Sequence, residues 1–188
     1  MWKWALVFSV FILTACQKSE IMTYRVPKQT ISIAQLSPPN SAKHLAWTIP
    51  DSWIEQPSSE FRLASYQVPS KASSYICDFS IVNFPGDAGG VLANVNRWRR
   101  QLNLSPIEIQ DLASILKPVN HPFLSISYLE LYSSNPPKSS SFDSMLVGFF
   151  MLADTSYFFK LTGSYSVVKT HADDFIGTLK SIRYDIPQ

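Results

Sequence analysis

The sequence predicts an α+β fold in which an antiparallel sheet of about six strands is flanked by helices, as an α/β/α sandwich. Short segments of alternating apolar and polar residues are separated by turns rich in Pro, Gly and Ser, which is typical of antiparallel strands. Other segments have helical periodicity and do not alternate one by one with the strands. A hydrophobic content of 46% over 188 residues supplies a core for one domain.

Three strand segments come first in the predicted domain. They are residues 45–49, 61–68 and 75–84. A Pro-Asp-Ser turn follows the first segment, Pro69 ends the second, and a Pro-Gly pair ends the third. In the third segment Cys77, Phe79 and Ile81 alternate with polar residues, so we expect these three side chains to face the core.

Two helices are predicted next. Residues 89–102 carry an apolar stripe, which consists of Val91, Val95, Trp98 and Leu102. Asp87 is a candidate N-cap or N-terminal anion for this helix. The second helix is expected over 106–116, with Ser105 as N-cap, Pro106 at N1 and Glu108 at N3.

The last part of the chain predicts three strands and a closing helix. The strands are 123–132, 142–152 and 157–162, with a Pro/Ser-rich loop at 133–141 and a hairpin turn at 154–156. Residues 142–152 are almost continuously apolar, which favours a central strand covered on both faces. The helix spans 167–182, and its expected buried face consists of Val168, Phe175, Leu179 and Ile182.

Residues 1–15 have the features of a bacterial export signal. Lys3 precedes an apolar stretch that would span about 18 Å as a helix, well short of the roughly 30 Å hydrocarbon core of a membrane. The stretch ends in Leu-Thr-Ala-Cys, which resembles the lipobox of bacterial lipoproteins. This resemblance implies a diacylglycerol thioether on Cys16 and cleavage before it. The alternatives are an uncleaved membrane anchor and a chance cysteine after an ordinary signal.

The predicted organisation is therefore a signal peptide at 1–15, a lipidated Cys16 with a flexible tether to residue 44, and one α+β domain at 45–188. The tether has a reach of roughly 30 Å as a coil, and 31–36 is a candidate edge strand within it. Gln17 is not the Asp that resembles an inner-membrane retention signal. We therefore expect a lipoprotein facing the periplasm, on the outer membrane if the host is Gram-negative.

A second resemblance rests on residues 47–102. The text Pro-Gly-Asp-Ala-Gly-Gly at 85–90, followed by Asn-Val-Asn-Arg-Trp-Arg at 94–99, resembles a group of bacterial envelope proteins that carry a PGDAGG…NVNRWR signature and have no known reaction. The element order resembles the Mog1/PsbP/DcrB-type α/β/α sandwich. That resemblance implies a binding or assembly accessory.

The same segment holds the candidate binding residues. They are Gly86, Asp87, Gly89, Gly90, Asn94, Asn96, Arg97 and Arg99. Glycines let backbone amides approach a ligand, and a helix N-terminus attracts anions. The alternative is structural: the glycines make a tight strand-to-helix turn and the Asn and Arg side chains brace neighbouring loops. The segment lacks the spacing of a phosphate-binding P-loop.

No catalytic or metal-binding constellation is evident in the sequence. The three histidines are His44, His121 and His171, and of these only His171 has a carboxylate, Asp174, at helical spacing. Cys77 is expected to be a buried, inert thiol. We therefore expect no metal and no cofactor. Trp47, Trp53 and Trp98 are candidates for carbohydrate stacking, although Trp98 falls on the apolar stripe.

These features predict a non-catalytic, lipid-anchored binding or assembly module of the cell envelope. Its partners would be the membrane, through Cys16, and an envelope protein or a small anionic ligand. A formal net charge of +2 argues against nucleic acid as a partner. The alternatives are an envelope enzyme that uses the Asp87/Asn94/Arg97 region and a purely structural lipoprotein.

Overall fold

The computed structural model describes residues 45–57, 59, 61–70, 77–135 and 142–184. All of them belong to one compact unit, Pro38–Gln188. The predicted signal peptide at 1–15, Cys16, the tether and the candidate edge strand at 31–36 lie outside the described residues. Among the described residues, no helix is long and apolar enough to cross a membrane.

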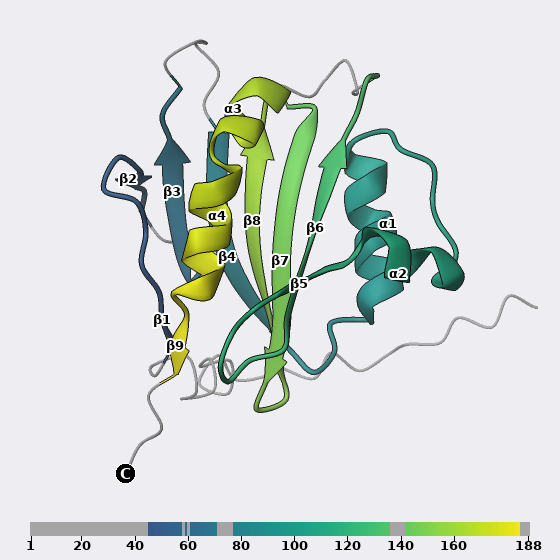
Figure 1. Cartoon of the computed structure of the whole chain (residues 1–188), viewed down its shortest axis with the longest axis horizontal. Coiled ribbons are helices and arrows are strands. Elements are labelled where there is room, and N and C mark those ends of the chain that lie inside the picture. The colour runs from purple at the N-terminus through teal and green to yellow at the C-terminus, as the bar shows by residue number, and fades with distance from the viewer. Residues whose placement is uncertain (1–44, 58, 60, 71–76, 136–141, 185–188) are drawn as a thin grey trace, which may run out of the picture. The chain divides into compact units, whose positions relative to one another are not determined.

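A seven-stranded sheet forms the middle layer (Figure 1), and every neighbouring pair of its strands is antiparallel. Its spatial order is β2-β3-β4-β8-β7-β6-β5. The strands are β2 (Ile54–Glu55), β3 (Ala64–Val68), β4 (Cys77–Pro85), β5 (Lys117–Val119), β6 (Ile126–Tyr132), β7 (Ser144–Leu152) and β8 (Thr155–Gly163). A separate two-stranded sheet pairs β1 (Leu45–Ala46) with β9 (Arg183–Tyr184).

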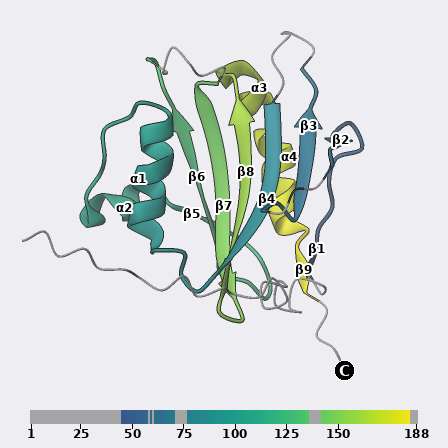
Figure 2. The ribbon, with the colours of Figure 1, turned by 180° about the vertical axis from the view of Figure 1, so that it is seen from behind.

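Helices cover both faces of the large sheet, and this confirms the predicted α/β/α sandwich. The helices are α1 (Val91–Gln101), α2 (Leu112–Ile115), α3 (Tyr165–Thr170) and α4 (Ala172–Lys180). Figure 1 shows α3 and α4 in front of the sheet. Seen from behind in Figure 2, β4 and β8 stand in front of α4, and α1 lies beside β6. Each layer of helices encloses its own hydrophobic core.

Alternation along β8 separates these two cores. Tyr157, Phe159 and Leu161 belong to the core under α3 and α4, whereas Phe158 belongs to the core under α1. Every second side chain of a strand points to the same face, so Lys160 shares the face of Phe158. The predicted central strand at 142–152 is β7, whose residues serve both cores, and its burial is confirmed for Met145, Leu146, Val147 and Phe150.

The number and placement of strands differ slightly from the prediction. Residues 45–49 were expected in the main sheet, but β1 pairs with β9 instead. Two strands of two and three residues, β2 and β5, complete the main sheet at its edges. Segments of this length are too short to show an alternating pattern.

The second predicted helix differs most from the structure. Residues 106–116 do not form one helix: a 3₁₀ turn at Ile109–Asp111 leads into the four residues of α2. Glu108 is the N-cap, and the carboxylate of Asp111 accepts a hydrogen bond from its backbone N–H at 3.0 Å. Ser105 and Pro106 lie before this start because side chains of α1 bind the backbone of 105–107, as described below.

The other boundaries shift for local reasons. The helix predicted at 89–102 starts at Val91 with Gly90 as N-cap, so Asp87 is not the cap. The strand predicted at 123–132 starts at Ile126, because Nδ1 of His121 accepts hydrogen bonds from the N–H groups of Phe123 and Leu124. The hairpin turn lies at residues 153 and 154, where φ is positive, and Thr155 already belongs to β8.

The closing helix is divided in two. α3 ends and α4 begins at His171, whose φ of −97° and ψ of 14° leave the helical region. The burial of the four expected residues is confirmed, since Val168, Phe175, Leu179 and Ile182 are at most 2% exposed. Ile182, however, lies after the end of α4 at Lys180 and is not part of the helix.

Candidate functional site

The glycine-rich turn joins β4 to α1 and is bound to the β7–β8 hairpin. Gly86 donates from its N–H to the carbonyl of Asp154 at 2.8 Å, and its own carbonyl accepts from Oγ of Ser156 at 2.6 Å. Gly86, Gly89 and Gly90 all have positive φ, from 65° to 87°. A side chain at these positions would be strained, so the glycines permit the tight reversal that starts α1.

Asp87 and Asn94 hold this turn from both sides. Oδ1 of Asp87 accepts a hydrogen bond from the N–H of Gly89 at 3.0 Å. Asn94 is 4% exposed, and its Nδ2 donates to the carbonyls of Ala88 and Gly90 at 3.0 and 2.8 Å. Both polar atoms of the Asn94 side chain are engaged, because its Oδ1 accepts from Arg97 at 2.7 Å.

Asn96 and Arg99 brace the segment that follows α1. The Asn96 amide makes two hydrogen bonds with the backbone of Ile107, donating from Nδ2 at 3.0 Å and accepting at Oδ1 at 2.8 Å. Nε of Arg99 donates to the carbonyl of Ser105 at 2.7 Å. All eight predicted binding residues therefore lie in turns or internal hydrogen bonds. Four of them also border hollows in the surface: Asp87, Gly90, Asn94 and Arg97.

One hollow lies beside α1 on its face of the sheet. We call it the cationic groove, and it has a volume of about 240 Å³. Its charged lining comes from three elements of the chain: Arg62 precedes β3, Arg97 lies on α1, and Lys160 lies at the middle of β8. The apolar part of its lining consists of Val82, Phe84, Trp98, Val147 and Phe158.

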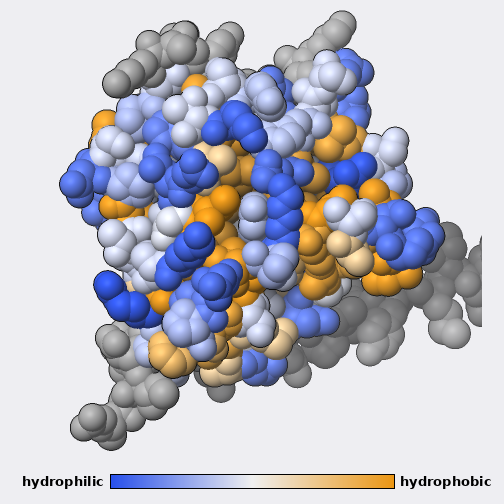
Figure 3. All heavy atoms as spheres, in the orientation of Figure 1, coloured by the Kyte–Doolittle hydropathy of each residue, from blue (hydrophilic) through white to orange (hydrophobic). Residues whose placement is uncertain are grey.

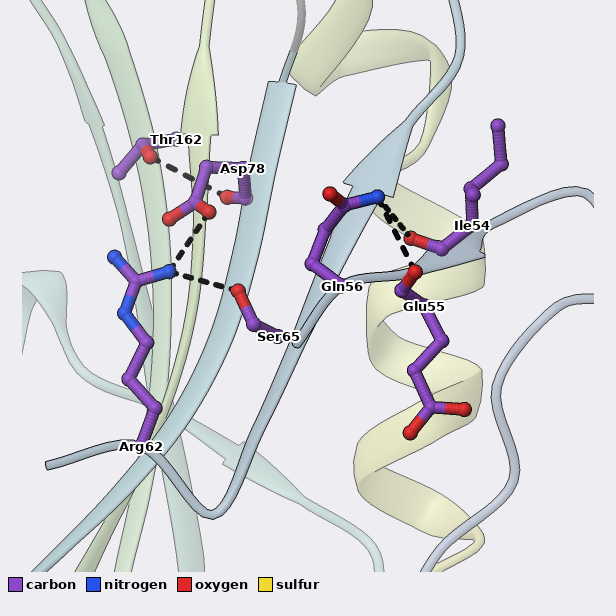
Figure 4. Close-up of polar contacts among 7 residues, drawn as sticks. All are labelled: Ile54, Glu55, Gln56, Arg62, Ser65, Asp78 and Thr162. Atoms are coloured by element: carbon purple, nitrogen blue, oxygen red, sulfur yellow. Dashed lines mark hydrogen bonds and ion pairs between the residues drawn. The ribbon is translucent and has the colours of Figure 1, made fainter. Parts of the chain in front are cut away.

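Arg62 lines the cationic groove and forms an ion pair with Asp78. Its Nη1 lies 2.9 Å from Oδ1 of Asp78 and 2.9 Å from Oγ of Ser65. Figure 4 shows the Arg62 side chain extending toward both partners. The Asp78 carboxylate is thus compensated by Arg62. Both side chains remain about two-fifths exposed, at 36% and 42%, so water still reaches the pair.

Lys160 forms the floor of the groove. It lies opposite Ser80 of β4 and Val147 of β7, and it is half-buried. Burial lowers the pKa of the Lys160 ammonium below its ordinary value, and the negative charge of Asp78 opposes this shift. Among the described residues, nothing forms a hydrogen bond or an ion pair with this ammonium.

A second hollow adjoins the cationic groove at the N-terminal end of α1. It has a volume of about 190 Å³, and the exposed side chains of Val91 and Met151 line it together with Phe149. The two hollows share Asn94, Trp98 and Phe158 in their linings. A mostly apolar hollow therefore lies next to a charged one. On the opposite face, viewed in Figure 3, hydrophilic residues surround hydrophobic ones near α4.

The remaining residues singled out in the sequence lie away from the groove. Cys77 is 1% exposed, and burial raises the pKa of its thiol to about 11, as expected for an inert cysteine. Nδ1 of His171 lies 2.8 Å from Asp174, which confirms that pair. Trp47 and Trp53 pack with the α4-side core and Trp98 with the α1-side core, so the three do not form one stacking surface. His44 is not among the described residues, and within them no His/Cys/Asp/Glu group fits a metal ion.

Sequence reasoning missed Arg62 and Lys160. Lys160 did carry a signal: it is the one charged residue in a strand segment, 157–162, that otherwise consists of aromatic residues, Leu161 and Thr162. Such a position requires either a partner or access to solvent. Arg62 carried no comparable signal, because only the pairing of β3 with β4 places it beside Asp78.

Comparisons with known proteins give structural similarities and no sequence match. No protein-family model matches the sequence, and none of the curated proteins matches it. The solution structure of cyanobacterial PsbP (CyanoP) from Synechocystis sp. PCC 6803 is similar at a TM-score of 0.45 and 12% identity, over 76% of this chain and 93% of that one. The crystal structure of LpqN, involved in cell envelope biogenesis of Mycobacterium tuberculosis, is similar at a TM-score of 0.47 and 13% identity, over 74% and 83%.

Proposed function

We propose that this chain is a lipid-anchored, non-catalytic binding or assembly module on the periplasmic side of a bacterial membrane. The observation that carries the proposal is the order of Lys3, an apolar stretch, Ala15 and Cys16. A thiol directly after a small residue at the end of a short signal is the substrate that lipoprotein processing requires. Two or three acyl chains, at about 0.8 kcal/mol per buried methylene, would anchor the chain stably.

The cationic groove supports binding as the role of the folded unit. Its lining combines apolar side chains with Arg97 and Lys160, and such a mixture is typical of ligand sites. Residues 85–99, which carry the signature, help to shape this groove. Asn94 and Asn96 fix the turn and the loop around α1, and this positions Arg97 and Trp98 along the groove.

Metabolic labelling with palmitate tests the anchor. The full chain should incorporate label and fractionate with membranes, whereas a Cys16→Ala chain should remain unlabelled. A Cys77→Ala chain is the matched control, because it removes the other cysteine and should be labelled normally. Label retained in Cys16→Ala would contradict the proposal.

Crosslinking in intact cells, followed by purification of the full chain, tests the accessory role. Arg97→Ala should lose an envelope component that wild type and Arg100→Ala recover, since both arginines lie on α1 but only Arg97 borders the groove. Recovery of the same component by all three proteins would assign binding to another surface. Repeated recovery of no component at all would count against an accessory role.

A further inference from the structure

We propose that the cationic groove binds an organic anion, a phosphate or carboxylate that carries an apolar group, with Lys160 and Arg97 contacting the anionic part. This inference rests on the proposed binding role and names its ligand class. It concerns residues outside the glycine-rich turn: Lys160 is on β8 and Arg62 precedes β3.

The balance of charge in the groove favours an anion. Three cationic side chains line it, and the carboxylate next to them, Asp78, is paired with Arg62. Arg97 donates to the amide oxygen of Asn94, which is neutral and leaves the guanidinium charge uncompensated. Neither Arg97 nor Lys160 forms an ion pair with an acidic side chain among the described residues, although the charge of Asp78 also acts on Lys160.

The position of Lys160 makes that charge costly without a ligand. The residue sits at the middle of a central strand, between Ser80 and Val147 in the register, with the buried ring of Phe158 two residues before it. An ammonium loses hydration there and gains no partner from the described residues. An anion bound beside it would restore the opposite charge in surroundings where Coulomb attraction is stronger than in bulk water.

The walls of the groove favour an apolar group on the same ligand. Trp98 and Phe158 line both the cationic groove and the adjoining hollow, so the two hollows meet along these rings. A ligand whose anion lies at Lys160 can extend along them toward Phe149 and Met151. Inorganic phosphate would use the charges and leave these surfaces in water.

Isothermal titration of the full lipidated chain in phosphatidylcholine nanodiscs tests the ligand class. Phenyl phosphate is the probe, inorganic phosphate lacks the ring, and benzyltrimethylammonium reverses the charge; empty nanodiscs are the blank. We expect phenyl phosphate to bind about 10-fold more tightly than inorganic phosphate, and we expect no binding of the cation. Equal affinity for the two phosphates, or binding of benzyltrimethylammonium, would overturn the proposal.

Two pairs of variants locate the site. Lys160→Met should weaken phenyl phosphate binding by at least about 10-fold and Arg97→Met by about 3-fold or more. Their matched controls, Lys169→Met and Arg100→Met, change exposed cations outside the groove and should bind as wild type. Melting temperatures show whether each variant is folded. Unchanged binding by folded Lys160→Met would overturn the proposal.

A final titration identifies the source of the anion. An anionic group attached to an apolar group occurs both in lipids and in soluble metabolites. The phenyl phosphate titration is therefore repeated in nanodiscs that contain phosphatidylglycerol, a lipid with an anionic headgroup. Competition supports the proposal with a lipid headgroup as ligand, and unchanged binding supports it with a soluble ligand. Absence of binding in every titration overturns this inference alone, because palmitate labelling and partner recovery test the proposed function separately.

Discussion

The two faces of the seven-stranded sheet differ in what covers them. On the α4 side, Phe79, Ile81, Phe159 and Leu161 form a continuous apolar layer with Phe175 and Leu179 of the helix. On the α1 side, the helix covers the β6–β7 half with Val95, Trp98 and Leu102. Beside that core, the β3–β4–β8 part carries Asp78, Ser80 and Lys160 on the same face.

This difference separates two tasks within the same strands. Because side chains alternate between faces, β8 contributes Phe159 to a packed core and its neighbour Lys160 to an open groove. We therefore expect substitutions on the α4 side to change mainly stability. Substitutions in the groove should change mainly binding.

Phe159→Ala should have the largest effect. The ring is fully buried and lies within 5.9 to 6.3 Å of the rings of Trp47, Phe79 and Phe150, measured between centroids. The cavity left behind should cost about 4 kcal/mol of unfolding free energy, measured by urea denaturation. Phe123→Ala, at a ring that is 89% exposed, is the control and should change little. Similar losses in both would mean that the α4-side core does not dominate stability.

Gly163→Ala should destabilise by overpacking. A Cβ at Gly163 would overlap Sγ of Cys77, so we expect a loss of about 2 kcal/mol. In the double variant with Cys77→Ala, the losses should be less than additive. Gly177→Ala is the control. Gly177 lies in α4, and no neighbouring atom is within 4 Å of the place that a Cβ would take. Because alanine favours the helix more than glycine does, this variant should be more stable by up to about 1 kcal/mol.

Alkaline pH should weaken the same core through Cys77. Burial raises the pKa of this thiol from its ordinary value of 9.0 to about 11 in the folded chain. The stability that this difference contributes is therefore complete below pH 9 and is lost as the pH rises through 11. Urea denaturation at several pH values should show a smaller fall for Cys77→Ala than for wild type. An equal fall in unfolding free energy with pH in Cys77→Ala and wild type would contradict the assignment of this effect to Cys77.

Asn96→Ala should cost about 1 kcal/mol, because its two hydrogen bonds with Ile107 are replaced in part by water. The loss should be local, and the amide of Ile107 should exchange its hydrogen faster. Gln101→Ala, at an exposed position of the same helix, should leave both stability and exchange unchanged. Unchanged exchange at Ile107 in Asn96→Ala would show that the amide does not hold this loop.

Segments with a regular hydrophobic pattern were predictable, because the same apolar side chains make the pattern and fill the core. The apolar run at 142–152 forms part of the core, and so do Val95, Trp98 and Leu102 of the predicted helical stripe. Val91, the first member of that stripe, is 40% exposed at the start of α1. Residues 105–107 were not predictable, because hydrogen bonds from Asn96 and Arg99 outweigh a good local helix start. The groove was not predictable as a unit either, since Arg62, Arg97 and Lys160 meet only through strand pairing and helix packing.

Urea denaturation of Lys160→Met, with and without phenyl phosphate, tests the division between the two faces most directly. Methionine keeps an apolar stem and removes the partly desolvated charge. Without the probe, the variant should therefore be more stable than wild type by about 1 kcal/mol. With the probe, wild type should gain stability and the variant should gain almost none. A variant that is less stable without the probe, or that gains as much from it as wild type, would contradict the account.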